Sequence, residues 1–230
     1  MNALTFRHIF SVAIFAGAFA GLVLTAVQLI QVVPTILEAE TYEQAGDVVQ
    51  LAAHGTVDAD EAWAPEDGLE RTLLTTLANV TIGLGFALLL GAAVVFNGSK
   101  ITVGRGLLWG LAGCVVFFAA PSLGLHPEIP GTEAAPLMER QIWWVATVIC
   151  SAAGLALIVF SPSLVAKVAG VALMVAPHAV GAPMPEVHSS LAPEALAHQF
   201  MIATAIANSA FWLALGAATG FFYQRLSLES

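Results

Sequence analysis

The sequence predicts an all-α membrane protein, a helical bundle that crosses the bilayer several times. Of its 230 residues, 58% are hydrophobic and 10% are charged, and the mean hydropathy is +0.85. Soluble domains carry about 25% charged residues, so a water-soluble fold of this size would expose too much apolar surface. Six apolar runs are separated by more polar links. Lipid offers backbone groups no hydrogen-bond partner, so these runs are expected to be helices.

Six segments are candidate spans, each of which needs about 20 mostly apolar residues. We interpret the first as a retained helix that ends at Pro34, because it is longer than the apolar part of a signal peptide. The fifth is the weakest, since it is short and contains Lys167. A five-span chain with a re-entrant or interfacial fifth segment is the alternative. Within a single transmembrane domain, 1–230, the predicted spans are 9–33, 72–96, 106–125, 142–160, 163–179 and 200–223.

The charges predict which side of the membrane each link occupies. With six spans, five of the basic residues fall on one side, which the positive-inside rule makes cytoplasmic. Both chain ends are therefore predicted to be cytoplasmic, and 15 of the 16 acidic residues fall on the outer side. Two arginines are outer exceptions, and they either pair with the preceding glutamates or anchor the helices at the interface. The cytoplasmic set is Arg7, Lys100, Arg105, Lys167 and Arg225, and the exceptions are Arg71 after Glu70 and Arg140 after Glu139.

Two further features concern the links and the packing of the helices. The longest link is the acidic outer loop 34–70, within which residues 35–51 have a partial apolar face and are predicted to form a helix. Pairs of glycines four residues apart let membrane helices approach closely. We expect three such pairs to pack helices within one bundle rather than between copies: Gly17 and Gly21, Gly106 and Gly110, and Gly216 and Gly220.

Five of the six histidines are predicted to lie on the outer side, and none lies in the middle of a span. A transmembrane b-type haem needs histidines that face each other within helices, so a haem oxidoreductase is disfavoured. Two proline-rich links, "PSLGLHPEIPG" and "APHAVGAPMPEVHSSLAPEALAHQF", hold most of these histidines beside glutamates. Glu194 and His198 are four residues apart, so they share one face of the sixth helix, whose first turn we place at Pro193 and Glu194.

Imidazoles and carboxylates together suit divalent transition metals, and prolines reduce the entropy that a loop loses on binding. We therefore predict an outer metal site at which ions enter. Its candidate ligands are His126, Glu128, His178, Glu186, His188 and His198. The alternative is that these histidines cap helices or bind water at the interface, since their spacing is no tight metal signature.

Several classes of function are disfavoured by what the sequence lacks. There is no phosphate-binding loop, hydrolase elbow, zinc-protease motif or dinucleotide fingerprint, so we predict neither an enzyme nor a tightly bound cofactor. The sequence has no patch of basic residues, so a nucleic-acid partner is disfavoured. Cys114 and Cys150 lie inside apolar runs and are expected to be buried thiols. No acidic residue lies in the middle of a span, where ion-coupled carriers often keep one.

The stretches "LHPEIPG", "RQIWW" and "APHAVGAPMPE", with the N-terminal "FRHIFSVAIFAGAFAGLVLTAVQLIQVVPTILEAE", resemble the CbtA family of predicted bacterial cobalt transporter subunits. The resemblance covers essentially the whole chain. It implies cobalt uptake in the bacterial inner (plasma) membrane, linked to cobalamin synthesis, beside a small histidine-rich partner, CbtB. It also implies about five spans, whereas the charge distribution favours six.

Two hypotheses of function follow. In the first, the chain is an integral membrane component of divalent metal uptake, with Co²⁺, or Ni²⁺ through the same ligands, as the transported ion. In the second, it is a structural or assembly subunit of a membrane complex that transports no metal of its own. Binding of Co²⁺ by the purified chain would favour the first hypothesis, and co-purification with a partner without such binding would favour the second.

Overall fold

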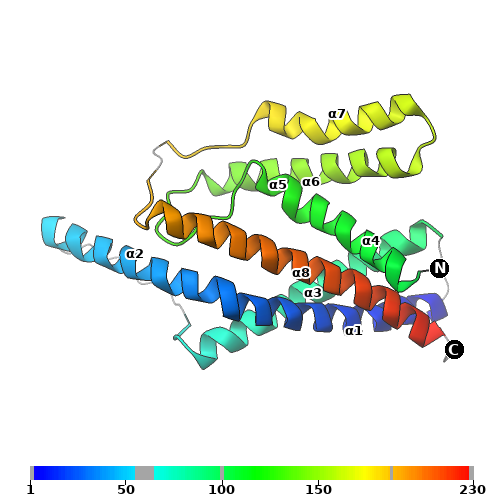
Figure 1. The fold of residues 1–230 in the computed structure, drawn as a ribbon, viewed down its shortest axis with the longest axis horizontal. Coiled ribbons are helices and arrows are strands. Elements are labelled where there is room, and N and C mark those ends of the chain that lie inside the picture. The colour runs from blue at the N-terminus through cyan, green and yellow to red at the C-terminus, as the bar shows by residue number, and fades with distance from the viewer. Residues whose placement is uncertain (1–2, 55–64, 99–100, 187–188, 228–230) are drawn as a thin grey trace. The chain divides into compact units, whose positions relative to one another are not determined.

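The computed structural model describes residues 3–54, 65–98, 101–186 and 189–227, most of which are helical (Figure 1). The predicted all-α class is confirmed, because these residues form no strand and only one isolated β-bridge. The elements are α1 (Ala3–Val27), the π-helix η1 (Gln28–Val32), α2 (Val33–His54), α3 (Leu69–Phe96), α4 (Val103–Cys114), the π-helix η2 (Val115–Ala119), α5 (Ala120–Ser122), α6 (Leu137–Phe160), α7 (Leu164–Val180) and α8 (Glu194–Ser227).

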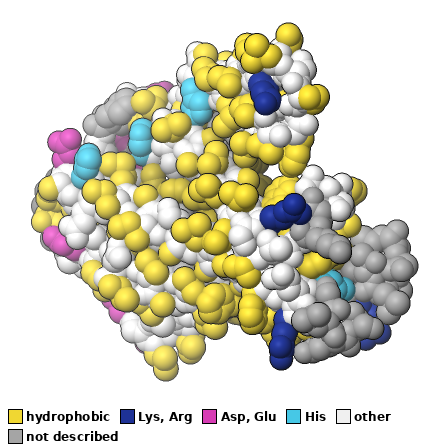
Figure 2. All heavy atoms as spheres, turned by 45° about the vertical axis from the view of Figure 1, so that its right-hand side comes forward, with side chains coloured by type: hydrophobic (Ala, Val, Ile, Leu, Met, Phe, Trp, Pro, Cys, Tyr) yellow, Lys and Arg dark blue, Asp and Glu magenta, His cyan; other side chains and the backbone are white. Residues whose placement is uncertain are grey.

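Five helical stretches are long and apolar enough to cross a membrane. The remaining predicted span corresponds to α7, which is apolar but has 17 residues. At 1.5 Å per residue, α7 rises about 26 Å, close to the roughly 30 Å of a hydrocarbon core. Hydrophobic side chains cover much of the face in Figure 2, as expected for contact with lipid. The five stretches are Arg7–Gly46, Leu69–Phe96, Val103–Ser122, Leu137–Phe160 and Glu194–Leu226.

The first helix does not end at Pro34 as predicted, because α1, η1 and α2 follow one another without a break. Proline lacks an N–H, and in an α-helix its ring clashes with the carbonyl four residues back. The π-helical turn before Pro34 widens the helix, and the Val33 N–H donates to the Gln28 carbonyl five residues back. The first part of the predicted acidic loop is therefore helical, and it includes the helix predicted over 35–51.

The same local arrangement recurs in the third predicted span. There η2 precedes Pro121, and the Ala120 N–H donates to the Val115 carbonyl five residues back. In both places the proline is the second residue after the π-helix. This span ends at Ser122, three residues before its predicted end at Leu125.

Contacts between residues divide the chain into two compact parts. The first part comprises Met1–Pro34, Val48–Leu111 and Ala203–Ser230, and the second comprises Thr35–Asp47 and Ala112–Ile202.

Close contacts between glycines hold the helices of the first part together. Gly17 on α1 lies against Gly83 on α3, and Gly21 lies against the backbone of Asn79 and Val80, so the two helices run antiparallel. On α4, Gly106 packs in the same way against α8. The predicted role of the three glycine pairs within one bundle is confirmed, since an added Cβ would meet backbone atoms at Gly17, Gly21, Gly83, Gly106, Gly110, Gly216 and Gly220.

A polar cluster joins the end of α1 and the first residue of η1 to α3. The Asn79 side-chain amide donates to Thr25 Oγ1 at 3.0 Å and to Gln28 Oε1 at 2.6 Å. The Thr25 hydroxyl in turn donates to the Gly21 carbonyl at 3.0 Å. Thr25 and Asn79 are buried, so within an apolar surrounding these bonds satisfy groups that would otherwise be costly to desolvate.

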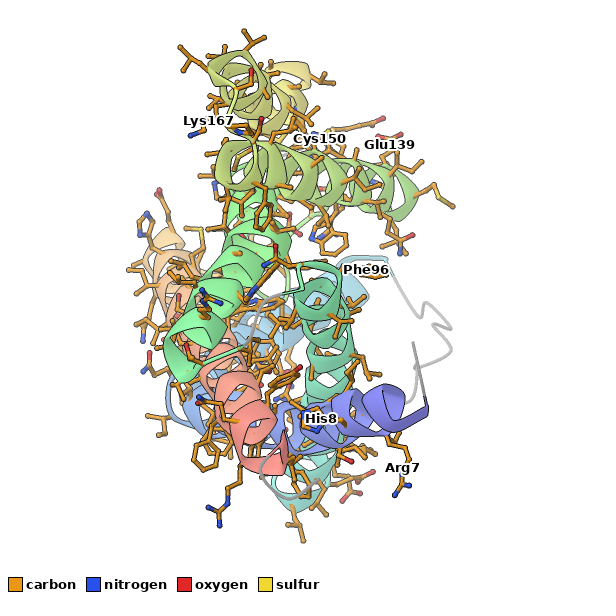
Figure 3. All side chains as sticks on the ribbon, turned by 90° about the vertical axis from the view of Figure 1, so that its right-hand side faces the viewer. Arg7, His8, Phe96, Glu139, Cys150 and Lys167 are labelled. Atoms are coloured by element: carbon orange, nitrogen blue, oxygen red, sulfur yellow. The ribbon has the colours of Figure 1, made fainter. Side chains whose placement is uncertain are left out.

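One end of the first part brings together both ends of the described chain. The His8 ring packs edge-on against Tyr223 with centroids 4.7 Å apart, and Phe15 stacks on Phe222. Figure 3 views this end, with His8 beside α8 and Arg7 extending away. Basic residues at this end, Arg7 and Arg225 among them, fit the predicted cytoplasmic side, although the orientation in a membrane stays a prediction.

The second part is built on the antiparallel pair of α6 and α7. Gly154 and Gly170 lie against each other's backbone, so the helices touch closely where each glycine is six residues from the helix end that adjoins the link. The link between them is short, and Ser163 caps α7 by accepting a hydrogen bond from the Ala166 N–H. At the far end of α7, the Trp143 indole N–H donates to the Pro177 carbonyl. The helix α7 thus runs back along α6 as far as Trp143, and its crossing of the membrane stays a prediction.

Candidate functional site

The second part of the chain holds all the described residues of the predicted outer metal site. His126 and Glu128 lie on the link between α5 and α6, His178 lies in the last turn of α7, and Glu186 lies on the link between α7 and α8. His198 lies near the beginning of α8 and is exposed. The remaining predicted ligand, His188, lies outside the described residues.

Trp143 connects two of the histidine-bearing stretches. Its indole N–H donates to the Pro177 carbonyl at 3.2 Å, and its ring packs edge-on against the His178 ring with centroids 5.6 Å apart. A Cβ added to Gly124, two residues before His126, would lie 2.7 Å from Cζ2 of the same indole. The beginning of one link and the end of α7 therefore meet at a single buried tryptophan, which is 8% exposed.

The two links are also fastened to each other farther along. Thr132 and Ser190 form an antiparallel β-bridge, in which the Glu133 N–H donates to the Ser189 carbonyl and the Leu191 N–H to the Gly131 carbonyl. The Ser189 hydroxyl donates to the Glu133 carboxylate at 3.2 Å. The bridge begins where Gly131 has a φ of +74°, a conformation that glycine adopts without a steric cost.

The two links touch at two points, and part of the candidate site lies between those points. A Cβ added to Gly124 would lie 3.0 Å from the Cβ of Ala182, so the links touch near their beginnings as well as at the bridge. The residues between the two contacts include His126 and Glu128 on one link and Glu186 on the other. Two segments 58 residues apart in the sequence thus place imidazole and carboxylate groups on neighbouring stretches of chain.

Glu128 has a cationic partner within the protein. Its carboxylate forms an ion pair with the Arg140 guanidinium at 3.1 Å, and each side chain is about one-third exposed. The sequence suggested Glu139 as the partner of Arg140, but successive residues of a helix do not face each other, whereas the folded link brings Glu128 to it. Similarly, Arg71 pairs with Asp67, four residues before it, at 3.1 Å.

The described part of the chain contains no group of three or more histidine, cysteine, aspartate or glutamate side chains arranged to hold a metal ion. Glu194 and His198 stand four residues apart on α8, which begins at Glu194 as predicted, and both are exposed. The structure thus brings the two links together without gathering the predicted ligands around one point. The ligand set stays a prediction, and one carboxylate oxygen of Glu128, Oε2, is already paired with Arg140.

Residues that organise the site were missed by reasoning from the sequence. Trp143 carries no metal-binding chemistry, and its one local signal is that it begins a buried row, followed by Thr147, Ser151 and Gly154, with helical spacing on α6. Nothing in the sequence indicates that Thr132 pairs with Ser190, because a single bridge between two links leaves no periodic pattern.

Comparison with known proteins identifies the family of the chain. No curated protein and no solved structure matches the chain. The family model described as "Probable cobalt transporter subunit (CbtA)" matches residues 6–224, which is nearly the whole chain. The match agrees with a multi-pass membrane protein and with the resemblance found in the links that carry the histidines. The chain therefore belongs to the CbtA family of probable cobalt transporter subunits.

Proposed function

We propose that this protein is the membrane component through which a divalent metal ion, cobalt above all, enters the cell. Membership of a family of probable cobalt transporter subunits carries the proposal. The apolar helices support a path across a membrane, and we assign that membrane to the bacterial inner (plasma) membrane. As a subunit, the chain acts with other proteins, and we propose a small histidine-rich membrane protein like CbtB as one of them.

In this proposal the outer links receive the ion. His126, Glu128, His178, Glu186, His188 and His198 are its first contacts. The pairing of the two links supports this role, since ligands on fastened segments lose less entropy when they bind. Imidazole together with carboxylate suits Co²⁺ and Ni²⁺. Acidic residues on the same side would raise the local concentration of cations.

Uptake of radiolabelled cobalt tests this function directly. Cells that produce the chain with its neighbouring small subunit are expected to accumulate several times more cobalt than cells without either. The same cells tested with labelled nickel show the selectivity of the path, and cells producing each subunit alone show which one is required. Equal accumulation with and without this chain would contradict the proposal and leave an assembly role as the better account.

The ion pair of Arg140 leads to a second expectation. Replacement of Arg140 by glutamine releases Glu128 and removes a positive charge beside the proposed site. Two unit charges about 4 Å apart interact by ~1 kcal/mol in water, so Co²⁺ is expected to bind about fivefold more tightly. Calorimetric titration of the purified chain in lipid nanodiscs measures this change.

The matched control is Arg71→Gln, which removes the same charge from an ion pair in the first part of the chain. It is expected to leave Co²⁺ affinity unchanged. If Arg140→Gln also left the affinity unchanged, or weakened it, Glu128 would not be a metal ligand.

A further inference from the structure

Trp143 is a buried aromatic residue at the place where the candidate site is assembled. It is the first member of the buried row of α6, and its side chain contacts both α7 and the link that follows α5. Its neighbour Trp144 instead faces outward, with 36% exposure, and its ring centroid lies 6.4 Å from that of Phe117. Two adjacent tryptophans thus have different surroundings, and only Trp143 reaches the histidine of α7.

Two contacts tie Trp143 to His178. The hydrogen bond from its indole N–H to the Pro177 carbonyl holds the backbone immediately before the histidine. The edge-on packing of the two rings, 72° between their planes, restricts how the imidazole can turn. Edge-to-face aromatic pairs contribute about 0.5–1.5 kcal/mol beyond the area that they bury, which is enough to favour one rotamer.

His178 lies at the C-terminal end of α7, which is a favourable place for a cation. The helix ends at Val180, the next residue, Gly181, has a φ of +91° that turns the chain, and His178 lies in the last turn. The last carbonyls of a helix lack amide donors and carry a partial negative charge, so a cation near His178 is stabilised. A metal ion bound by this imidazole would therefore lie at the favourable end of the helix dipole.

Gly124 gives Trp143 room on its other side. A Cβ at this position would overlap Cη2 of the indole, and the ring is rigid, so it would have to move. The same glycine leads into the link that carries His126. A shift of Trp143 would therefore disturb the beginnings of both fastened links.

We propose that Trp143 is a positioning residue that orients His178 for the metal ion. Gly124 has no side chain, and it thereby leaves room for the indole ring of Trp143 in this position. The inference rests on the proposed function, because it needs His178 to be a ligand. Groups that orient metal ligands typically change metal affinity by 10- to 100-fold when they are removed. We therefore expect Trp143→Phe, which keeps a ring but loses the N–H donor, to weaken Co²⁺ binding about tenfold.

The test uses the full chain in nanodiscs with three variants. Trp143→Phe removes the hydrogen bond, Gly124→Ala displaces the indole without altering it, and Trp144→Phe is the matched control at the adjacent position. The first measurement needs no metal: proton NMR of the histidine rings, with the His178 signals assigned from a His178→Gln variant. Both perturbing variants are expected to shift the His178 signals, and Trp144→Phe is expected to leave them in place.

The second measurement is Co²⁺ affinity by calorimetry. Weaker binding in Trp143→Phe and Gly124→Ala, with unchanged binding in Trp144→Phe, would support the positioning role. Shifted His178 signals with unchanged affinity would overturn it while leaving the proposed metal site intact, and so would unshifted signals. Absence of Co²⁺ binding in the unaltered chain would overturn the proposed function and this inference with it. Since the two perturbing variants alter different residues, a loss of folding in one leaves the other to decide.

Discussion

Replacing His126, His178, His188 and His198 together with alanine is expected to lower cobalt accumulation to the level of cells that lack the chain. Only Glu128 and Glu186 would then remain of the proposed ligands. Carboxylate oxygens alone suit Mg²⁺, Ca²⁺ and Mn²⁺ better than Co²⁺, so the remaining pair would not select cobalt. Uptake of radiolabelled cobalt, normalised to the amount of protein in the membrane, measures the effect.

The control for this experiment is His8→Ala, because His8 is predicted to lie on the cytoplasmic side and packs on Tyr223. It is expected to retain uptake. Substitutions at exposed positions such as His126 and His198 usually change stability by less than about 0.5 kcal/mol, whereas replacing His178 also removes its packing on Trp143. The folding of the fourfold variant is therefore checked by its Tm before uptake is compared. Unchanged cobalt uptake in that variant would refute the outer metal site.

The largest effects on stability are expected at glycines that touch another backbone. Gly83→Ala and Gly106→Ala would each place a methyl group against a carbonyl oxygen, of Gly17 and of Gly216 respectively. Backbone atoms cannot turn away as a side chain can, so the helices must separate and lose their close contacts. Such overpacking costs about 1–3 kcal/mol, which corresponds to a fall in Tm of roughly 2–12 °C in a chain of this size.

Each of these glycines has a matched control two residues away on the same helix. A Cβ added to Gly85 on α3 or to Gly104 on α4 meets no atom within 4 Å. Because alanine favours a helix more than glycine does, Gly85→Ala and Gly104→Ala are expected to keep or raise the Tm. Thermal unfolding of the purified variants in detergent gives the comparison, and equal losses at both kinds of position would rule out the close helix contacts.

Much of the fold could be predicted from the sequence because the membrane restricts it. Apolar length and the need to satisfy backbone groups predict helices, and all six predicted spans have a helical counterpart. Close packing at Gly17, Gly106 and Gly216 was also predictable, since small residues four apart leave a local pattern. The passage of the helix through Pro34 was not, because rules for proline assume the α register and the π-helical turn depends on the surrounding structure.

Some features of the candidate site could likewise be predicted from the sequence, and others could not. The sequence indicates which residues have metal-binding chemistry and that most share one part of the chain. It gives no sign that Arg140 pairs with Glu128, because that contact depends on how the link folds back onto α6. The bridge between Thr132 and Ser190 joins segments that are far apart in the sequence, and a single pair of residues has no periodicity to detect.

The π-helical turns also change the rotational phase of the helices that contain them. Each residue of an α-helix advances by about 100°, so one extra residue in a turn rotates everything after it by that angle. Removing one residue from Gln28–Val32 would therefore rotate the buried side chains of Thr35 and Ala39 by about 100° about the helix axis. A single unbroken helix can in this way present differently aligned faces on the two sides of Pro34, and a uniform advance of about 100° per residue from end to end would assign the wrong face to one half.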